Sequence, residues 1–380
     1  MNAAEESPLA QLEARARRYQ RRKRLLRLAD FLLGLAFLVV LLVSGWSLGL
    51  RHWAFGLTAD PVGALALYLL VLTGISQALS FPLDFWSAHR LEHQFGLSNQ
   101  RFLGWLKDWL KALAISLALA LAAVELIYWM LRRLPDIWWL VCAAAFVAFF
   151  ILLAQLAPVL LFPLFFKFEP LQDEELQRRL LQLSERVGAR VRSVWLWKLS
   201  EKSKKANAAL MGWGRTRRIV LADTLLEKHQ PDEVEVVLAH ELAHHVHHDL
   251  WRGMALQTAL ILVGFYAVHR ALAAWSEPLG FAGPADFANL PLLLLVSGGV
   301  SLLALPAANA FSRSRERRAD AFALRATGNR QAFIGAMEKL AEQNLAQRRP
   351  HPWIEFLFHS HPSVEKRIAF AQSWQSPAEG

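Results

Sequence analysis

Long apolar runs separated by charged segments dominate the pattern of this chain. At about 20 residues each, six of the runs are long enough to cross a hydrocarbon core of roughly 30 Å as helices. They lie at Leu28–Leu50, Val62–Leu83, Leu110–Leu131, Ile137–Phe166, Met254–Trp275 and Leu290–Phe311. We expect Pro158 and Pro163 to bend or end the fourth run, because proline removes a helix hydrogen bond and clashes with the preceding turn. The pattern predicts a mainly α, polytopic membrane protein.

Two segments, residues 167–249 and 312–380, are polar enough to fold in water. A pair of spans separates them, so both are expected on the same side of the membrane. The first contains a helical stretch that ends at Gly188, "DEELQRRLLQLSERVG". Two strand-like runs follow, "SVWLW" and "RRIVLAD", joined through "NAALMGWGRT". The expected parts are a basic arm (1–27), a four-helix transmembrane region (28–166), a small α+β subdomain (167–249), a transmembrane hairpin (250–311) and a C-terminal subdomain (312–380).

The distribution of Lys and Arg predicts which side faces the cytoplasm. An arginine-rich arm, "RARRYQRRKRLLR", precedes the first span, whereas the loop at 276–289 has no Lys or Arg. Because cytoplasmic loops carry the excess of basic residues, the arm and both polar segments are expected in the cytoplasm. Arg132 and Arg133, in a short outer turn, go against this rule. The Arg-, Leu- and Ala-rich composition looks bacterial, which suggests the inner membrane.

Composition narrows the alternatives. The chain of 380 residues is 54% hydrophobic, and its formal charge is +10. We expect the charge to face anionic lipid rather than nucleic acid, because no nucleic-acid-binding motif accompanies it. The single cysteine, Cys142, cannot form an internal disulfide. The basic arm followed by a long apolar run is not typical of a cleavable signal.

The stretch "VVLAHELAHHVHHD", residues 236–249, contains an H-E-x-x-H motif. The preceding "QPDEVEVVLA" has a proline and two acids in its first turn, which favours a helix start. On a helix, His240 and His244 share a face and can bind one metal ion. Glu241 then lies beside them, placed to act on a water at the metal. Two imidazoles, one carboxylate and an open position are typical of catalytic zinc. The alternative is a surface helix with hydrogen-bonded histidines.

A third ligand is available downstream in "NAFSRSRERRADAFAL". Glu316 and Asp320 are four residues apart, so Glu316 could complete the metal site while Asp320 accepts the outer N–H of a ligand histidine. The alternative is a solvated charge run, which we expect for the arginines here. His245, His247 and His248 lie on other faces of the first helix and are expected to be surface or interface residues.

These pieces together resemble the type I CaaX prenyl protease family of integral-membrane zinc metalloendopeptidases. The matching segments follow the family's order along most of the chain: "PLDFWSAHRLEHQFGLSNQRFLGWLKDWLK", "LFPLFFKFEPLQDEEL", "NAALMGWGRTRRIVLADTLL", "AHELAHHVHHD", "NAFSRSRERRADAFA" and "SHPSVEKRI". The six apolar runs and the resemblance together imply six transmembrane helices around a cavity and a small α+β protease domain on the cytoplasmic side. It also implies one bound Zn²⁺ and hydrolysis of membrane-associated peptides or proteins, which could be lipid-modified or membrane-inserted.

The resemblance assigns roles to individual residues. It makes His240, His244 and Glu316 the zinc ligands and Glu241 the general base and acid. It places Asn309, Arg313 and Asp320 around the ligands. Asn207 and Ala208 would lie where a peptide substrate adds to a sheet edge. His361 and Arg367 match positions near the scissile carbonyl, where a cation or imidazole could stabilise the oxyanion.

The sequence also departs from the family. Eukaryotic members have seven spans, whereas six are expected here. Ala243 replaces a glycine within the motif, and "KKANAAL" differs from the usual serine-asparagine-alanine-tyrosine run. The rival functions are a heat-shock-type quality-control protease, an inactive zinc-stabilised scaffold and a transporter. Because water must reach the metal, we expect a polar cavity among the spans, with Gln155, Gln257 and Asn309 as candidate lining residues. Helix–helix hydrogen bonds are the alternative role for these three.

Overall fold

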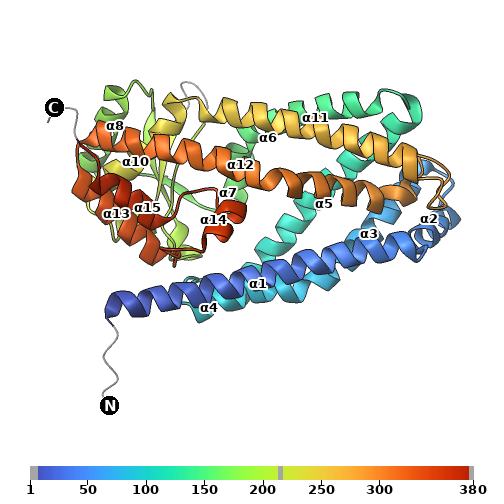
Figure 1. Cartoon of the computed structure of the whole chain (residues 1–380), viewed down its shortest axis with the longest axis horizontal. Coiled ribbons are helices and arrows are strands. Elements are labelled where there is room, and N and C mark those ends of the chain that lie inside the picture. The colour runs from blue at the N-terminus through green and yellow to red at the C-terminus, as the bar shows by residue number, and fades with distance from the viewer. Residues whose placement is uncertain (1–6, 213–216, 376–380) are drawn as a thin grey trace, which may run out of the picture.

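The computed structural model describes residues 7–212 and 217–375, and most of its long helices run along the length of the molecule (Figure 1). Within these residues, six helices are long and apolar enough to cross a membrane. They are α1 (Pro8–Val43), α3 (Pro61–Asp84), α5 (Phe102–Arg133), α6 (Trp138–Leu156), α11 (Asp249–Trp275) and α12 (Leu290–Thr327). The prediction of six spans is confirmed.

The first span differs from its prediction at both ends. The basic arm and the apolar run form one continuous helix, α1, which begins at Pro8. This helix ends at Val43 rather than Leu50, because Gly45 takes a left-handed conformation with φ of 74°. The chain then turns into the short helix α2 (Trp46–Leu57). Hydropathy could not locate this turn, since apolar residues continue on both sides of it.

Two spans continue through π-helical turns into short helices. The turn η1 (Phe85–Arg90) joins α3 to α4 (Leu91–Gln94). The turn η2 (Ala157–Leu161) joins α6 to α7 (Phe162–Phe165) and contains Pro158. Proline has no backbone N–H and so cannot make the usual helix hydrogen bond. In a π-helical turn the backbone bonds join residues five apart, and the helix can continue past Pro158. The predicted interruption of the fourth span at Pro158 is therefore confirmed.

The first polar segment contains a four-stranded sheet with the order β1-β2-β4-β3. The strands are β1 (Phe168–Pro170), β2 (Ser193–Trp197), β3 (Ala208–Met211) and β4 (Arg218–Ala222). β2 and β4 pair in parallel, whereas β1 and β3 are antiparallel to their neighbours. The sequence predicted β2 and β4 and missed the two outer strands, which are short and carry no alternating pattern. Residues 213–216 of the predicted connection lie outside the described residues.

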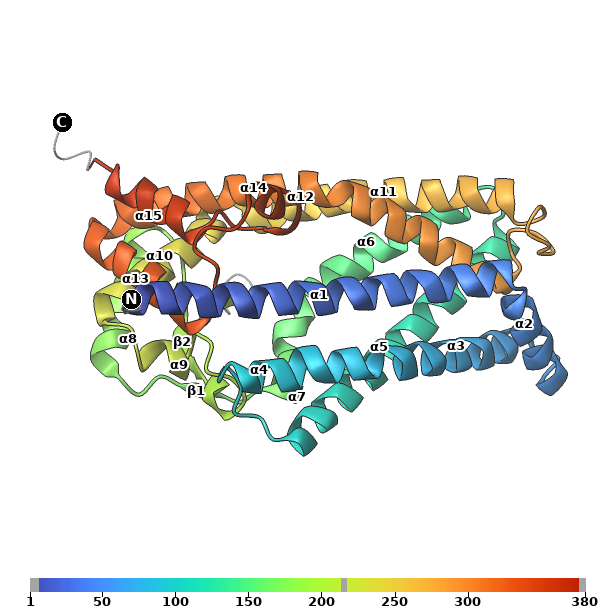
Figure 2. The ribbon, with the colours of Figure 1, turned by 60° about the horizontal axis from the view of Figure 1, so that its bottom comes forward.

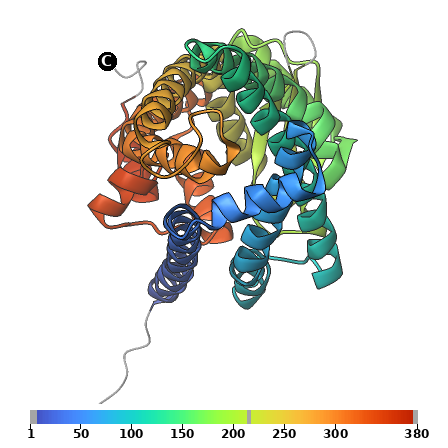
Figure 3. The same ribbon diagram turned by 90° about the vertical axis from the view of Figure 1, so that its right-hand side faces the viewer.

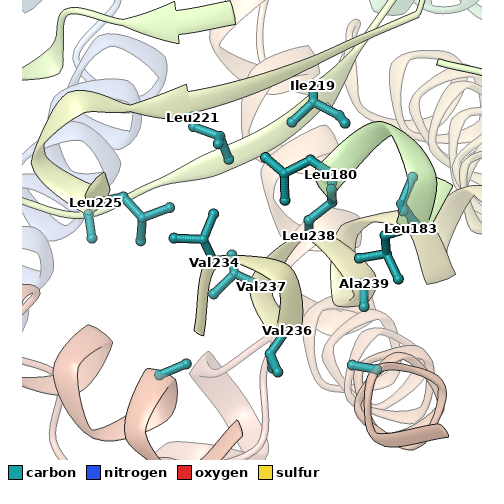
Figure 4. Close-up of a cluster of buried hydrophobic side chains, with 14 of the residues drawn as sticks. Leu180, Leu183, Ile219, Leu221, Leu225, Val234, Val236, Val237, Leu238 and Ala239 are labelled. Atoms are coloured by element: carbon teal, nitrogen blue, oxygen red, sulfur yellow. The ribbon is translucent and has the colours of Figure 1, made fainter. Parts of the chain in front are cut away.

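Both polar segments contribute to one hydrophobic core beside the sheet (Figure 4). Leu180 and Leu183 of α8 (Glu174–Arg186) pack near Ile219 of β4 and Leu238 of α10 (Pro231–Val246). The same core includes Phe333 of α13 and Ile368 of α15. The remaining helices of this part are η3 (Leu199–Glu201), α9 (Asp223–Leu226), α13 (Arg330–Gln343), α14 (Pro352–Phe358) and α15 (Val364–Gln372).

The hairpin of α11 and α12 connects the two ends of the elongated molecule (Figure 2). At the far end, α2 and the 3₁₀ turn η5 (Phe287–Asn289) lie close to each other. Seen from that end, the helices are arranged around the long axis (Figure 3). A cavity of about 540 Å³ lies among α5, α6, α11 and α12, with an apolar lining that includes Gln257. The predicted cavity is present, and its lining is more apolar than expected.

Candidate metal centre

Two packed helices, α10 and α12, supply the candidate ligands. α10 begins with Pro231 at its first position and a capping box between Gln230 and Glu233. This start fixes the helix that follows. His240 and His244 therefore lie one turn apart on the face of α10 that packs against α12. The contact between α10 and α12 is the most extensive one between two elements of the described chain. Glu316, on α12, faces them.

One ligand atom from each of His240, His244 and Glu316 lies within 4.8 Å of the other two. Nε2 of His240 is 3.1 Å from one carboxylate oxygen of Glu316, and Nε2 of His244 is 3.5 Å from the other. The sequence proposed this trio, and the α11–α12 hairpin brings its members together. Two imidazole nitrogens and a carboxylate converging on one point fit a single metal ion.

Each candidate ligand histidine has a carboxylate on its outer nitrogen. Nδ1 of His240 is 2.9 Å from Asp320, as the spacing on α12 suggested. Nδ1 of His244 is 3.0 Å from Asp249, the buried first residue of α11, which sequence reasoning missed. His248 takes a left-handed conformation with φ of 56°, and the turn brings Asp249 back toward His244. The sequence signal for this contact was the position of Asp249, an acid five residues after the candidate ligand His244.

The charge of the cluster favours a cation at its centre. Burial alone would lower the pKa of His240, but the carboxylates of Asp320 and Glu316 outweigh it and raise this pKa to about 9. The two carboxylates next to His240 thus favour a positive charge at this point. A divalent ion that binds nitrogen and carboxylate oxygen suits this set of ligands.

Glu241 lies between two cavities. A cavity of about 380 Å³ is lined by Glu241, His244, Gln155 and the β3 residues Ala209 and Leu210. Another, of about 520 Å³, is lined by Glu241, Asn207, Ala208, His361 and Arg367. Burial raises the pKa of the Glu241 carboxyl, although the nearby histidines oppose the shift. Glu241 lines both cavities, so its carboxylate could act on a peptide bond of a substrate chain that extends from one cavity into the other.

His361 and Arg367 lie next to the ligand trio but differ in their contacts. Nδ1 of His361, whose side chain is largely exposed, is 2.7 Å from Glu316. Arg367 is mostly buried, with 13% of its side chain exposed, and its guanidinium donates two hydrogen bonds to Asp320, at 2.9 and 2.5 Å. Nη2 of Arg367 is also 3.3 Å from Nδ1 of His240. Arg367 thus contacts the groups that orient a ligand, whereas His361 faces the open cavity.

Asn309 and Arg313 reach a different target from the one expected. Nδ2 of Asn309 donates to the carbonyl of Leu357 at 2.7 Å. Arg313 donates to the carbonyls of Glu355 and His359 at 3.1 and 2.7 Å. Both residues therefore hold the C-terminal end of α14 and the chain leading to His361. Of the two roles expected for Asn309, cavity lining or a helix–helix hydrogen bond, this contact between α12 and α14 fits the second.

β3 is the outer strand of the sheet on the side of the two cavities. Asn207 is exposed, and its side-chain oxygen accepts a hydrogen bond from the backbone of Ala208 at 2.9 Å. One edge of β3 pairs with β4, with Ala208 opposite Leu221. Because β3 is last in the strand order, its other edge can accept an extended peptide.

The three other histidines of this stretch, His245, His247 and His248, are not among the candidate ligands. His245 and His248 line the 380 Å³ cavity. The ring of His247 meets Phe322 edge-on, with centroids 5.4 Å apart. Gln155, expected among the spans, lines the same cavity as His245.

Comparison with known proteins gives the same picture along almost the whole chain. The model of peptidase family M48 matches residues 170–375, and that of the CAAX prenyl protease N-terminal region, described as five membrane helices, matches residues 8–167. A metalloprotease of Bacillus subtilis, YhfN, named as uncharacterized, is 31% identical over 344 residues, which cover 90% of this chain and 80% of that protein. CAAX prenyl protease 1 of Saccharomyces cerevisiae is 28% identical over 79% of this chain and 70% of its own length.

The fold also matches a solved structure. The crystal structure of S. mikatae Ste24p superposes with a TM-score of 0.84, covering 97% of this chain and 91% of that one at 23% identity. The chain belongs to peptidase family M48 and carries the N-terminal membrane region of the CAAX prenyl proteases. It is a multi-pass membrane metalloprotease with a metal cofactor, and it acts on peptide or protein substrates.

Proposed function

We propose that the metal is one Zn²⁺ ion held by His240, His244 and Glu316, and that the protein is a zinc endopeptidase for membrane-associated chains. The convergence of these three ligands within 4.8 Å is the observation that carries the proposal. Zinc at three protein ligands with an open position supplies Lewis-acid polarisation of a carbonyl and a water of lowered pKa. Asp320 and Asp249 would fix the ring orientation of the two histidines.

Glu241 acts as general base and acid in this proposal. It adjoins the ligands without being one, and its raised pKa suits a group that both accepts and donates a proton near neutral pH. Glu241 accepts the proton of the attacking water as the new C–O bond forms. It then donates that proton to the amine nitrogen as the C–N bond breaks.

The open edge of β3 would bind the substrate backbone beside Glu241. An extended chain paired with β3 along Ala208–Met211 would run from the 520 Å³ cavity into the 380 Å³ cavity. Asn207 would contact the main chain at the start of this strand. Main-chain pairing selects for extended peptides and leaves sequence preference to the cavities.

His361 and Arg367 take separate roles in the proposal. His361 faces the cavity next to Glu316, so it would donate a hydrogen bond to the oxyanion. Arg367 acts as a positioning residue, because its guanidinium holds Asp320, which in turn holds His240. A positive group behind Asp320 also keeps that carboxylate ionised as an acceptor.

The site would face the cytoplasm of a bacterial cell, on the side of the arginine-rich arm. The arm, the sheet and the C-terminal helices all lie at the same end of the molecule (Figure 1). The rule that basic segments stay in the cytoplasm supports this orientation. The resemblance to CAAX prenyl proteases supports cleavage near the C-terminus of lipid-modified peptides.

Peptide cleavage by the purified protein tests the proposal. The assay uses a peptide ending in a cysteine-containing CaaX-type sequence, with and without a prenyl group, and a Glu241→Gln variant as the control. We expect cleavage of the prenylated peptide, about one zinc per chain and cleavage by the variant that is slower by about 100-fold or more. Cleavage by the variant at the wild-type rate would contradict the role of Glu241, and faster cleavage of the unmodified peptide would contradict the lipid preference.

A further inference from the structure

We propose that α14 is an interfacial helix whose aromatic face rests on the lipid bilayer, and that it couples the bilayer to the segment carrying His361. Trp353 and Phe356, three residues apart on one face of this helix, point outward and are 67% and 44% exposed. Its inward face carries Glu355, which is 6% exposed. Such an inverted pattern, apolar outside and charged inside, fits an environment of lipid rather than water.

The contact of α14 with α12 indicates its level relative to the surface of the membrane. Asn309 and Arg313 contact it where the apolar run of α12 gives way to the charged run "SRSRERRAD". This boundary is where a spanning helix leaves the hydrocarbon. Trp and other aromatic residues are enriched at that depth, where an apolar ring and a polar edge are both accommodated.

The orientation of α14 also suits the membrane surface. The carbonyls of Glu355, Leu357 and His359, at its C-terminal end, converge on two side chains one turn apart on α12. The C-terminal end of α14 therefore rests on α12, and the axis of the short helix is inclined to that of α12 (Figure 1). In this direction α14 can lie along the surface of a bilayer that α12 crosses. Arg313 also places a positive charge at the helix C-terminus, which is electrostatically favourable.

The helix that holds α14 in place also exposes apolar residues along its span. On α12, Leu302 and Leu303 are exposed at 51% and 84%. This helix is long and apolar enough to cross a membrane, and its charged run begins where it contacts α14. The occupant of the aromatic face is therefore the interfacial region of the same bilayer.

The inward face of α14 connects to the active site. The carboxylate of Glu355 accepts hydrogen bonds from Lys366 at 3.0 Å and from the backbone N–H of Ser363 at 3.4 Å. Ser363 precedes α15, which carries Arg367, and it lies two residues after His361. Any shift of α14 is thus transmitted to both residues. This catalytic consequence rests on the proposed role of His361, whereas the lipid contact does not.

Site-directed quenching tests the lipid contact. Trp353→Cys in a Cys142→Ala background is labelled with the fluorophore NBD in phosphatidylcholine vesicles containing lipid spin-labelled near the headgroup end of its acyl chain. Arg349→Cys, at an exposed position just before α14, is the matched control. We expect strong quenching at position 353 and weak quenching at 349. Equal, weak quenching at both positions, or cross-linking of two copies through the thiol introduced at position 353 without quenching, would overturn the contact.

Turnover in vesicles tests the coupling. The double variant Trp353→Ser/Phe356→Ser is compared with Leu303→Ser, an exposed apolar position on α12 away from α14. We expect the double variant to lose kcat several-fold while its metal content and KM stay at wild-type values, and Leu303→Ser to match wild type. An unchanged kcat in the double variant would overturn the coupling and leave the lipid contact standing. Failure of the proposed peptidase function would appear separately, as uncleaved peptide with the wild-type protein.

Discussion

The hairpin of α11 and α12 has a buried polar cluster at each of its ends, and the two clusters are built differently. At the far end, Tyr128 donates to Asn289 at 2.6 Å, and Asn289 donates to the carbonyl of Pro284 at 2.9 Å. Ser47 bonds with Tyr68 at 2.7 Å and donates to the carbonyl of Ala288. Arg51 pairs with Asp286. There the donors and acceptors match within the protein.

At the other end, three carboxylates, those of Glu316, Asp320 and Asp249, surround the imidazoles of His240 and His244. Two of them pair with arginines, Asp320 with Arg367 and Asp249 with Arg318, whereas Glu316 faces the two imidazoles. The ligand atoms of this trio converge on a shared point. The comparison teaches that a matched network holds helices together, whereas a convergent set of ligand atoms is built for a cation that the amino-acid chain does not itself supply.

Removal of the metal should have the largest effect on this contrast. We expect a strong chelator to abolish turnover and Zn²⁺ to restore it, because the metal activates the attacking water and polarises the scissile carbonyl. The far cluster should remain intact, so the spans should stay folded. Peptide cleavage and helical circular dichroism, measured on the same sample, check both. Full activity in a metal-free sample would remove the distinction between the clusters.

Glu241→Gln should lower kcat by about 10²- to 10⁴-fold, the contribution expected of a general base. The amide keeps the shape of the side chain but cannot accept the proton of water. Metal content should remain at the wild-type value, since Glu241 is not in the ligand trio. Metal analysis beside kinetics decides the case, and loss of metal in this variant would make Glu241 a structural part of the centre.

His361→Ala should lower kcat and kcat/KM together by roughly 100-fold, if His361 donates to the oxyanion. Its metal content should be unchanged. The control is His359→Ala, in the same segment. Normal kcat in folded, metal-loaded His361→Ala would remove this residue from the chemistry.

Asp249→Ala should weaken metal affinity by about 10- to 100-fold, because the outer nitrogen of His244 loses its carboxylate. Saturating zinc should restore most of the turnover. Asp286→Ala, at the far cluster, is the matched control and should bind metal as wild type does. Competition titration with a chromogenic chelator measures both. Equal affinities in the two variants would mean that Asp249 does not act on the metal site.

Tyr128→Phe should have the smallest catalytic effect and a distinct effect on stability. The change leaves the buried amide oxygen of Asn289 without its donor, which costs about 1–3 kcal/mol. We expect a lower Tm with unchanged kcat per folded molecule. Tyr266→Phe, at an exposed position, is the control and should leave Tm unchanged. A fall in kcat at constant Tm would link the far cluster to catalysis.

The sequence by itself determined the elements and the chemistry that local patterns encode. Apolar length set the six spans, because a helix must match the bilayer thickness. Four-residue spacing put His240 with His244 and Glu316 with Asp320 on common faces, because both pairs lie within single helices. The order of the motifs along the chain was enough to indicate the family, since each motif is a short run of neighbouring residues.

The tertiary structure decided the contacts between elements. Asp249 reaches His244 only because His248 turns the chain, and Arg367 meets Asp320 only because α15 packs beside α12. The fold directs Arg313 to the carbonyls at the end of α14, a target that its neighbours along the chain do not indicate. β3 pairs with β4 although four small or apolar residues carry no strand signal of their own. Such contacts depend on the positions of whole helices and strands, which no local spacing of residues specifies.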